Sequence, residues 1–307
     1  MNHFATAPPD QPALMSSNPI VDLSSVTVCA ADSIHPALAA RALDISAARC
    51  TFADAILFTH ETVPARAART VLIPRLQSKQ DYSAFMIKHL VNHVTTPWVL
   101  VIQWDGYVLD ATAWSETFFG YDYIGACWPF HADGMNVGNG GFSLRSRKLL
   151  QVLAGARFEF LPGVNEDDLI CRTYRPLLEA EYGIRFAPAD VAARFAYEHI
   201  RPDDPTFGFH AAFNMWRHVD DDMMMEMVGA LDVRTFTSSE VMQLLMAYCN
   251  LRKFACIKVM YERYRSLWST QQIVQNMLAT GVPGEAILQY VDLCERLVNN
   301  DNRGFGT

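Results

Sequence analysis

The chain has 307 residues, of which 50% are hydrophobic and 19% are charged, and its formal net charge is −8. This length and apolar content suffice for one large domain or two small ones with a buried core. The acidic excess argues against bulk binding to nucleic acid or anionic lipid, so a negatively charged ligand would need a local basic group or a metal ion.

The seven cysteines and the N-terminal residues bear on the compartment. The cysteine count is odd, no C-x-x-C pair occurs, and most cysteines lie in apolar segments, which indicates reduced thiols and predicts a cytoplasmic protein. Residues 1–20 contain four prolines and no basic segment followed by an apolar stretch, so we expect a disordered tail rather than a signal peptide. No apolar run reaches the roughly eighteen residues that cross a membrane, so no transmembrane segment is expected.

The first hundred residues alternate between strand and helix patterns. Strand patterns occupy residues 23–30, 53–59, 71–73 and 98–102, and helix patterns occupy 35–49 and 81–94. Residues 98–102, WVLVI, are continuously apolar and mostly β-branched, as expected of a central strand buried on both faces. The alternation predicts a largely parallel sheet with helices on both faces.

The middle of the chain predicts a mixed continuation of this sheet. We expect strands at 121–126, 141–145 and 184–187, a glycine-containing loop at 127–140, a helix at 146–154, and another helix that begins at Asn165. Residues 21–217 are therefore expected to form one α/β domain.

From about residue 218 the pattern becomes helical. Helices are expected at 239–249, 252–268, 270–279 and 283–299, and residues 220–222 are expected to form a solvated loop. Residues 218–307 are therefore predicted to form an α-helical module, which could serve dimerisation of two copies or docking of an acceptor.

The first candidate site is QWDG at residues 103–106, directly after the predicted buried strand. Ligands of open α/β sheets bind beyond the carboxyl ends of the strands, which is where Asp105 would place a carboxylate. A hard divalent cation that bridges a carboxylate and a diphosphate would suit this position. The alternative is that Asp105 and Gly106 only form a turn.

The second candidate is the string NVGNGGFS at residues 136–143. Glycines allow the backbone to approach a ligand without a Cβ atom, and a sugar could bind to bare amides and to the side chain of Asn139. Gly140 and Gly141 would make the closest approach. The alternative is a flexible hairpin turn.

The third candidate is the acidic string NEDD at residues 165–168. A positioned carboxylate could take the proton of an attacking hydroxyl group, and Glu166 and Asp167 are the candidates. The alternative is that Asn165 only caps a helix whose first turn is acidic.

Two further residues could serve an anionic ligand. His210 follows the turn FGF, and a neutral imidazole there could complete the coordination of Mn²⁺, although a lone histidine is more often packed or hydrogen-bonded. Lys79 could meet a phosphate at the start of its helix, and the alternative is a solvated lysine.

Several of these strings resemble a bacterial family of GT-A-like proteins of unknown function. The matching strings are PRLQSKQDYSAFM, VLVIQWDGYVLD, YDYIGACW, NVGNGGFSLRSRKLL, NEDDLICRTYRPLLE, GIRFAP and TFGFH. The resemblance ends near residue 216 and leaves out the helical C-terminal part. It implies a GT-A-like, Rossmann-like α/β fold for the first part of the chain.

The order of the motifs is also similar to that of β-1,4-galactosyltransferases. That similarity implies a metal-motif role for Asp105, sugar contact for Gly140 and Gly141, a base role for Asp167, and a later metal-ligand role for His210. The chain departs from the motif at Gln103, which stands where those enzymes have the first aspartate.

We therefore predict an inverting glycosyltransferase that moves a sugar from a nucleotide-sugar donor, with UDP implied by the resemblance, to a hydroxyl group of a glycan or other acceptor. Gln103, Asp105, Asn139, Gly140, Gly141 and Lys79 are expected to bind the donor. Asp105 and His210 are expected to hold Mn²⁺ or Mg²⁺. The alternative function is a non-catalytic carbohydrate- or partner-binding protein on a degenerate transferase fold.

Overall fold

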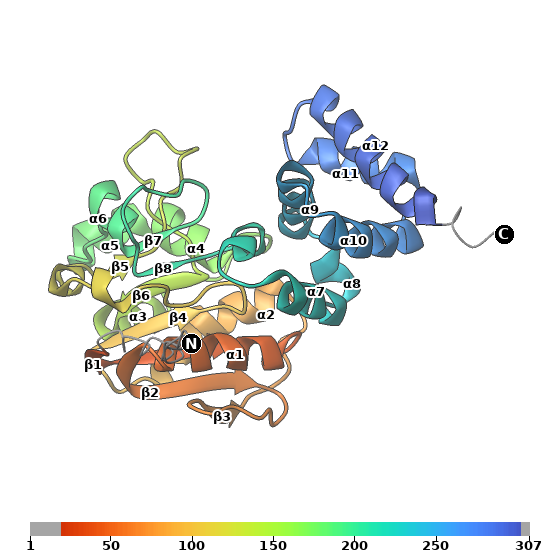
Figure 1. Cartoon of the computed structure of the whole chain (residues 1–307). Coiled ribbons are helices and arrows are strands. Elements are labelled where there is room, and N and C mark those ends of the chain that lie inside the picture. Colours follow the sequence, from red (N-terminus) through yellow and green to blue (C-terminus); the bar gives the residue numbers. More distant parts are fainter. Residues whose placement is uncertain (1–19, 302–307) are drawn as a thin grey trace, which may run out of the picture.

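A computed structural model describes residues 20–301 of the chain (Figure 1). The tail expected over residues 1–20 therefore lies outside the described residues, apart from Ile20. Within the described part, an α/β region is followed by a set of helices, as the sequence predicted.

One mixed sheet of six strands forms the centre of the α/β region, in the order β3-β2-β1-β4-β6-β5. Strands β3, β2, β1 and β4 are parallel, β6 is antiparallel to β4, and β5 is antiparallel to β6. The strands are β1 (Val21–Ala31), β2 (Cys50–Thr59), β3 (Arg69–Leu72), β4 (Trp98–Ile102), β5 (Tyr123–Ile124) and β6 (Phe142–Ser146). The prediction of a mostly parallel mixed sheet is confirmed.

Strand β4 shows why the sheet has helices on both faces. Its side chains alternate between the two faces, and its last four residues are fully buried. Leu100 and Ile102 join the core cluster that includes helix α1 (Pro36–Ala47), whereas Val99 and Val101 join the cluster on the other face with the helical segment after α2. An apolar run without alternation is thus what a strand between two helical layers requires.

The remaining helices of this region are shorter and less regular than expected. They are α2 (Lys79–Ala84), α3 (Arg147–Ala154), α4 (Glu166–Asp168), α5 (Arg175–Tyr182) and α6 (Ala189–Phe195). The helix expected at 81–94 begins as α2 and continues as a π-helical turn and then a 3₁₀ turn, and α4 also continues into a π-helical turn.

The strand expected at 184–187 is not formed. The segment makes a single parallel bridge, between Phe186 and Tyr123 of β5. Pairing stops there because β5 itself has only two residues and because Pro188 ends the extended segment as the residue before α6.

Two short strands and a 3₁₀ helix follow. Strands β7 (Ala196–Tyr197) and β8 (Gly208–Phe209) pair in parallel, and the 3₁₀ helix η6 (Ala212–Arg217) leads out of the α/β region. Asn214 of η6 donates hydrogen bonds of 2.8 Å from Nδ2 to the backbone oxygens of Glu198 and His210. These bonds tie the end of the α/β region to the start of the helical region.

The helical region comprises α7 (Asp221–Ala230), α8 (Val233–Phe236), α9 (Ser239–Leu251), α10 (Phe254–Leu267), α11 (Thr270–Ala279) and α12 (Gly284–Asp301). The four helices predicted from periodicity are confirmed within two residues at each end. The loop expected at 220–222 is wrong: Asp220 caps α7 by accepting a hydrogen bond from the N–H of Met223, and the next two aspartates form the acidic first turn.

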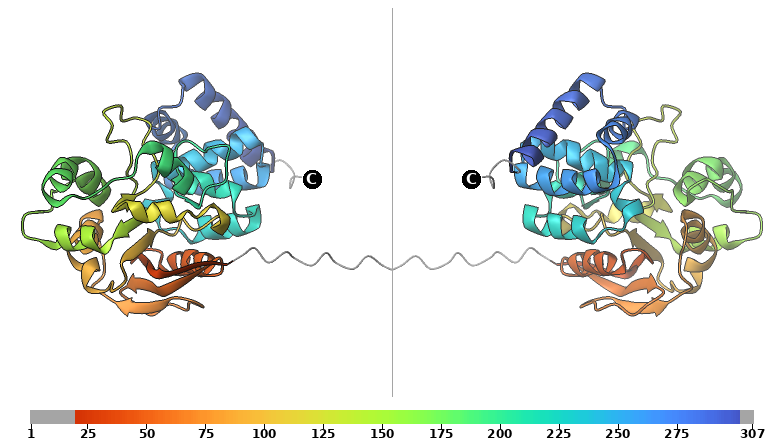
Figure 2. Two further views of the ribbon diagram at one scale, coloured as in Figure 1. Left: turned by 90° about the vertical axis from the view of Figure 1, so that its left-hand side faces the viewer. Right: turned by 90° about the vertical axis from the view of Figure 1, so that its right-hand side faces the viewer.

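The helical region stands on the α/β region without covering its sheet. In Figure 2 the C-terminal helices lie at the opposite end of the molecule from β1, β2 and β3. Helix α9 packs against η6, and His35 Nε2 lies 3.0 Å from the hydroxyl of Thr235, just ahead of α9. The junction therefore lies beside the segment that contains His210.

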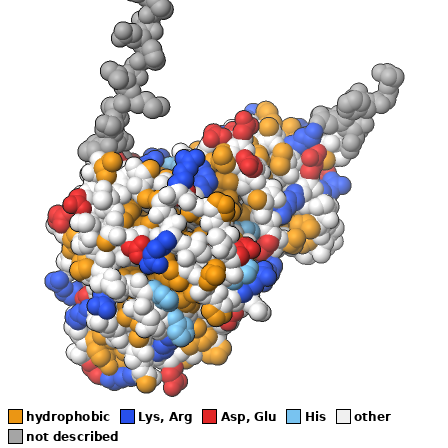
Figure 3. Space-filling model, turned by 90° about the horizontal axis from the view of Figure 1, so that it is seen from below, with side chains coloured by type: hydrophobic (Ala, Val, Ile, Leu, Met, Phe, Trp, Pro, Cys, Tyr) orange, Lys and Arg blue, Asp and Glu red, His pale blue; other side chains and the backbone are white. Residues whose placement is uncertain are grey.

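Two surface properties complete the description. No helix within residues 20–301 is long and apolar enough to cross a membrane. On the face drawn in Figure 3, acidic, basic and hydrophobic side chains are interspersed. On that face, the net negative charge is therefore not gathered into one acidic patch.

Candidate active site

A cavity of about 500 Å³ opens at the carboxyl ends of β1 and β4, the edge of the sheet where a ligand was expected. It gathers side chains from the α/β region and from the helical region. Of the predicted site residues, the cavity is lined by Lys79, Gln103, Asn139, Gly140, Gly141, Glu166, Asp167 and His210. Asp105 reaches it through its contact with His210.

Asp105 lies just after β4 and is 3% exposed. The N–H of Gly106 donates to the carbonyl of Gln103, so residues 103–106 do form a turn, as the alternative interpretation of Asp105 and Gly106 predicted. The turn also directs the carboxylate inward, where Oδ1 of Asp105 has no hydrogen-bond partner and lies 3.4 Å from Nε2 of His210. A buried carboxylate oxygen that makes no hydrogen bond and lies at ion-pair distance from an imidazole is more than a turn requires.

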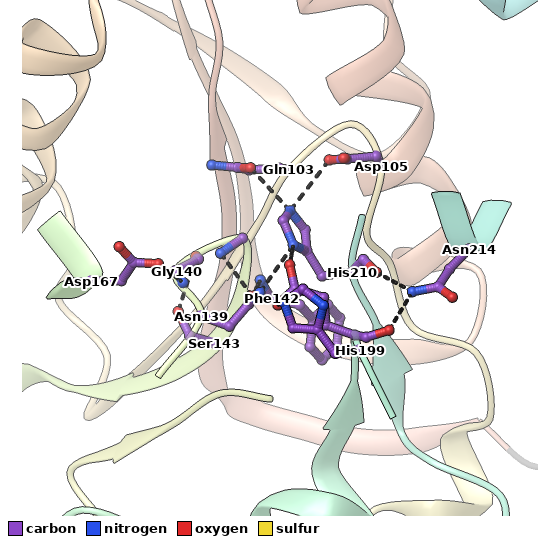
Figure 4. A network of polar contacts seen from close by, with 12 residues as sticks. Gln103, Asp105, Asn139, Gly140, Phe142, Ser143, Asp167, His199, His210 and Asn214 are labelled. Carbon is purple, nitrogen blue, oxygen red and sulfur yellow. Dashed lines mark hydrogen bonds and ion pairs between the residues drawn. The ribbon is translucent and has the colours of Figure 1, made fainter. Parts of the chain in front are cut away.

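His210 is the centre of the polar network in Figure 4. Its Nε2 lies 3.1 Å from Oε1 of Gln103, and its Nδ1 lies 3.1 Å from Oε1 of Glu198. Burial by itself would lower the pKa of His210, but the carboxylates of Asp105 and Glu198 raise it well above the ordinary value. Burial would likewise raise the pKa of Glu198, and the bond to His210 reverses this and lowers it.

Asn139 lies against this imidazole and indicates which group accepts its Nδ1–H. Its backbone is left-handed, with φ of 63°, and its Oδ1 accepts hydrogen bonds from the N–H groups of Gly141 and Phe142. Its Nδ2 must therefore be a donor, and it lies 3.1 Å from Nδ1 of His210. Since this amide nitrogen cannot accept a proton, Glu198 is the acceptor for the Nδ1–H group.

The glycines of this segment make room for protein side chains. A Cβ atom on Gly141 would lie 2.0 Å from Nε2 of His210, and one on Gly140 would lie 2.2 Å from Oε1 of Glu166. The close approach that glycine permits is thus occupied on one side by the chain itself. Sugar contact by Gly140 and Gly141 stays a prediction, and the hairpin-turn alternative accounts for neither contact.

The acidic segment divides into one buried and one accessible carboxylate. Glu166 is 4% exposed and pairs with the fully buried Arg145, whose Nη2 lies 2.8 Å from its Oε1. Burial and the neighbouring charge of Asp167 raise the pKa of Glu166, while Arg145 opposes this shift. Asp167 is half-buried, and its Oδ2 accepts a hydrogen bond of 3.0 Å from the N–H of Gly140.

This arrangement separates the roles that the sequence left open. Glu166 is held in an ion pair with Arg145, whereas Asp167 faces the cavity and is anchored to the glycine segment. Asn165 occupies the N-cap position, but its side chain makes no capping hydrogen bond. Helix capping therefore explains less of the acidic string than its composition suggests.

Lys79 is the first residue of α2, is exposed, and lines the cavity. The helix start is fixed by a capping box between Ser78 and Asp81. The ammonium group of Lys79 therefore lies at the rim of the cavity, where it could meet an anionic group of a ligand.

Sequence reasoning missed several lining residues: Asp32, His35, Glu198, Thr235 and Glu240. Asp32 could have been found, because it follows β1 as Asp105 follows β4, at the same edge of the sheet. Its carboxylate accepts hydrogen bonds from the N–H groups of Ile34 and His35. Glu198 and Glu240 carry no local signal, since only the tertiary fold brings them to the cavity.

The donor atoms suit a divalent cation only if Gln103 takes part. Within residues 20–301, no three side chains among His, Cys, Asp and Glu are arranged to hold a metal by themselves. However, Nε2 of His210 lies 3.1 Å from Oε1 of Gln103 and 3.4 Å from the orphaned Oδ1 of Asp105. Neighbouring ligands of an octahedral Mg²⁺-sized ion are about 3 Å apart, and both of these distances from Nε2 are close to that spacing.

Glu198 fits the same interpretation. A histidine that binds a metal through Nε2 usually donates its Nδ1–H to a carboxylate, and Glu198 is in that position. Because the ligand must be neutral imidazole, a cation would have to displace the proton that the two carboxylates favour.

Comparisons with known proteins cover the middle of the chain and the fold. Residues 67–210, less than half of the chain, match the model of a family described as a protein of unknown function (DUF5672). The matched segment includes every predicted site residue and Glu198, but neither Asp32 nor Glu240. No curated protein matches the chain.

Three solved structures resemble the chain distantly. A galactosyltransferase LgtC in complex with donor and acceptor sugar analogues is 12% identical, with 67% of this chain and 96% of that chain covered and a TM-score of 0.43. An active-site mutant of LgtC is 13% identical, with 67% of this chain and 96% of that chain covered and a TM-score of 0.41. A glycosyltransferase involved in glycosylation of the major capsid of PBCV-1 is 12% identical, with 61% of this chain and 92% of that chain covered and a TM-score of 0.38. At these values none of them assigns a reaction or a residue role to this chain, whose middle segment is similar to a family of unknown function.

Proposed function

We propose that the protein is a glycosyltransferase that uses the cavity at the ends of β1 and β4 to move a sugar from a nucleoside diphosphate to an acceptor hydroxyl. One observation carries the proposal: Nε2 of His210, Oε1 of Gln103 and the orphaned Oδ1 of Asp105 converge beside a cavity that Asp167 also faces. A cation held by these atoms and a proton acceptor at Asp167 would then share one cavity. The motif order described above supports a GT-A-like enzyme with a UDP-sugar donor.

Donor binding would depend on groups of both charges. Gln103, Asp105 and His210 would hold Mn²⁺ or Mg²⁺, which would offset the negative charge that develops on the leaving diphosphate. Glu198 would keep the imidazole oriented through Nδ1. Lys79 at the rim would add a positive charge for a phosphate, and Asn139 would keep the glycine segment in its left-handed turn.

The transfer step would use Asp167. The acceptor oxygen attacks the anomeric carbon as the bond from that carbon to the diphosphate oxygen breaks, and the proton of the acceptor hydroxyl goes to the Asp167 carboxylate. A single displacement of this kind inverts the anomeric configuration. The N–H of Gly140 would hold the carboxylate in place throughout.

Nucleotide binding tests the proposal. We expect one nucleoside diphosphate, UDP first, to raise the unfolding temperature in the presence of Mn²⁺, because a ligand of the folded state stabilises it. Asp105→Asn keeps the side-chain volume but removes the charge, and it should abolish the Mn²⁺-dependent part of this shift. Asp203→Asn, an exposed substitution away from this cavity, is the control. Equal shifts in wild type and Asp105→Asn would contradict the cation role.

The second candidate function is a non-catalytic binding protein for a carbohydrate or a partner. Two observations favour it. The carboxylates of Asp105 and Glu198 flank His210 and favour its protonated form, which does not bind a metal. Gln103 also stands where the resembling galactosyltransferases have an aspartate. A protein of this kind should respond to carbohydrates and ignore nucleotides, with or without Mn²⁺. The same thermal-shift panel therefore separates the two functions. Cytoplasmic location and dimerisation through the C-terminal helices stay predictions in either case.

A further inference from the structure

The wall of the cavity is completed by residues from outside the matched segment. Thr235 and Glu240 both line it, although they belong to the helical region. Glu240 is the second residue of α9, whose N-cap is Ser238. An acidic residue in a first turn is expected from the helix dipole alone, so its position in the sequence says nothing about a site.

The surroundings of Glu240 distinguish it from an ordinary first-turn acid. The side chain is half-buried, and within residues 20–301 no hydrogen bond or ion pair satisfies its carboxylate. Other acids of the cavity are satisfied: Asp32 and Asp167 accept backbone N–H groups, and Glu166 and Glu198 pair with cationic groups. Glu240 is thus a carboxylate at the cavity wall that has no partner within the described residues, and it is free to interact with a ligand that brings a positive charge.

The charges that Glu240 experiences are those of the proposed cation site. Burial raises its pKa to about 7, and the next contributions come from Asp105, His210, Glu198 and Lys79. Glu240 therefore belongs electrostatically to the site at the end of β4 and is already mostly ionised at slightly alkaline pH. A cation bound beside Asp105 would favour the ionised form further.

The position of Glu240 relative to His210 is fixed by the fold. Helix α9 packs against η6, and η6 is tied to the backbone oxygens of His210 and Glu198 by the side chain of Asn214. A second link joins Thr235 to His35, which also lines the cavity. The helical region is therefore held at the cavity at two points.

The charge balance of the proposed site provides the reason for such a group. Asp105 supplies one negative charge, and Gln103 supplies none where the resembling enzymes have an aspartate. The two positive charges of a divalent cation at this site would therefore face only one negative charge from Asp105 and Gln103 together. One further carboxylate from α9 would restore the balance.

We propose that the helical region contributes Glu240 to the cation site, and that its carboxylate replaces the negative charge that Gln103 does not provide. This inference rests on the proposed function. Glu240 does not form a three-ligand cluster with Asp105 and His210 in this structure, so it acts on the cation through a bound water molecule rather than as a direct ligand.

Direct measurement of Mn²⁺ affinity tests the inference without any need for an acceptor. Binding is measured by calorimetry on the full chain at pH 8, with Mn²⁺ alone and with Mn²⁺ in the presence of UDP. Glu240→Gln keeps the shape and removes the charge, and we expect it to weaken Mn²⁺ binding about tenfold, equal to about 1.4 kcal/mol. The matched control is Asp222→Asn, which removes a charge from the same position of α7 on an exposed residue.

A double substitution makes the test specific. Gln103→Glu combined with Glu240→Gln returns the lost charge to the other side of the site, and it should recover most of the affinity that Glu240→Gln loses. Non-additivity of this kind is the mark of two groups that act on one ion. A general effect of Glu240→Gln on folding would not be rescued at position 103, and the unfolding temperature of each variant checks folding separately.

The outcomes separate this inference from the proposed function. If wild type binds Mn²⁺ and Glu240→Gln binds it equally well, the role of Glu240 is overturned and the cation site stands. If the double variant stays as weak as Glu240→Gln, compensation for Gln103 is overturned. If wild type binds neither Mn²⁺ nor UDP with Mn²⁺, the proposed cation site fails and this inference fails with it.

Discussion

Two cavities of the molecule are each lined by a histidine, and the pKa values of these two histidines are shifted in opposite directions. His210, in the cavity described above, has carboxylates on both ring nitrogens, and its pKa is raised. His218 lines a second cavity of about 340 Å³ together with Arg49, Arg201 and two tyrosines. Burial lowers the pKa of His218 to about 4, and three arginines add to the shift.

The difference shows that burial does not decide the state of a histidine. Desolvation favours neutral imidazole at both positions, and the sign of the neighbouring charges then reinforces or reverses it. His218 is left as a neutral partner of the Tyr197 hydroxyl, 2.6 Å away. His210 is left as a cationic group among carboxylates, a position that a metal ion could take over.

The largest effect that we expect comes from the ion pair under the first cavity. Glu166→Gln leaves the buried guanidinium of Arg145 without its counter-charge, which should lower the free energy of unfolding by about 3 to 5 kcal/mol. Denaturant unfolding measures the loss. Arg201→Gln, at the exposed rim of the second cavity, should change stability by no more than about 0.5 kcal/mol. Similar losses of unfolding free energy in the two variants would show that the buried ion pair contributes no more to stability than an exposed charge.

The next effect concerns catalysis at Asp167. Asp167→Asn keeps the shape and removes the proton acceptor, so turnover of the nucleotide-sugar should fall by a factor on the order of 10² while UDP binding persists. Turnover is followed as release of nucleoside diphosphate. Tyr197→Phe, which breaks the contact with His218 in the second cavity, is the control and should leave turnover intact. Full activity of Asp167→Asn would mean that the acidic string only starts a helix.

The smallest effect is a pair of opposite pH dependences. The folded-state pKa of His210 is raised above its unfolded value of about 6.5, so its contribution to stability is complete below that pH and is lost as pH rises through the folded-state pKa. The folded-state pKa of His218 is lowered to about 4, so stability at this position is retained above about pH 6.5 and falls as pH drops towards 4.

Unfolding temperatures from pH 4 to pH 9, in the presence of a chelator, measure both. Relative to wild type, His210→Gln should lose stability mainly at low pH, whereas His218→Gln should become relatively less destabilised at low pH, because the acid-linked loss at this position is removed. Parallel curves for the two variants would show that the neighbouring charges do not set the two states.

Much of the fold follows from local patterns in the sequence. The apolar run at 98–102, the alternation before it and the helical periodicity after residue 239 predict the central strand, the parallel half of the sheet and the C-terminal helices. The strand at 184–187 fails because its length depends on a partner, β5, of only two residues. The helix at Asp221 was missed because three adjacent aspartates suit a loop as well as a capped first turn.

The site was predictable where it depends on chain position and not where it depends on tertiary contacts. Asp105 follows a buried strand, and helical geometry predicts that Glu166 and Asp167 point in different directions. Which of the two is buried is decided by Arg145 on β6, far away in the chain. The reason for the glycines also lies elsewhere, since the space at Gly141 is required by His210 and the space at Gly140 by Glu166.

The pairing of β4 with β6 has a consequence for how such a site can diverge. Ile102 lies opposite Phe142 in the register of the two strands, so QWDG leaves the sheet where the glycine segment enters it. The exposed stretch around Ala132 and Gly134 between β5 and β6 can lengthen or shorten without altering that register. A slip of one residue within β6 would instead turn its side chains to the opposite faces. Related proteins could therefore vary the loop between β5 and β6 by insertion or deletion while the β4–β6 pairing stays unchanged.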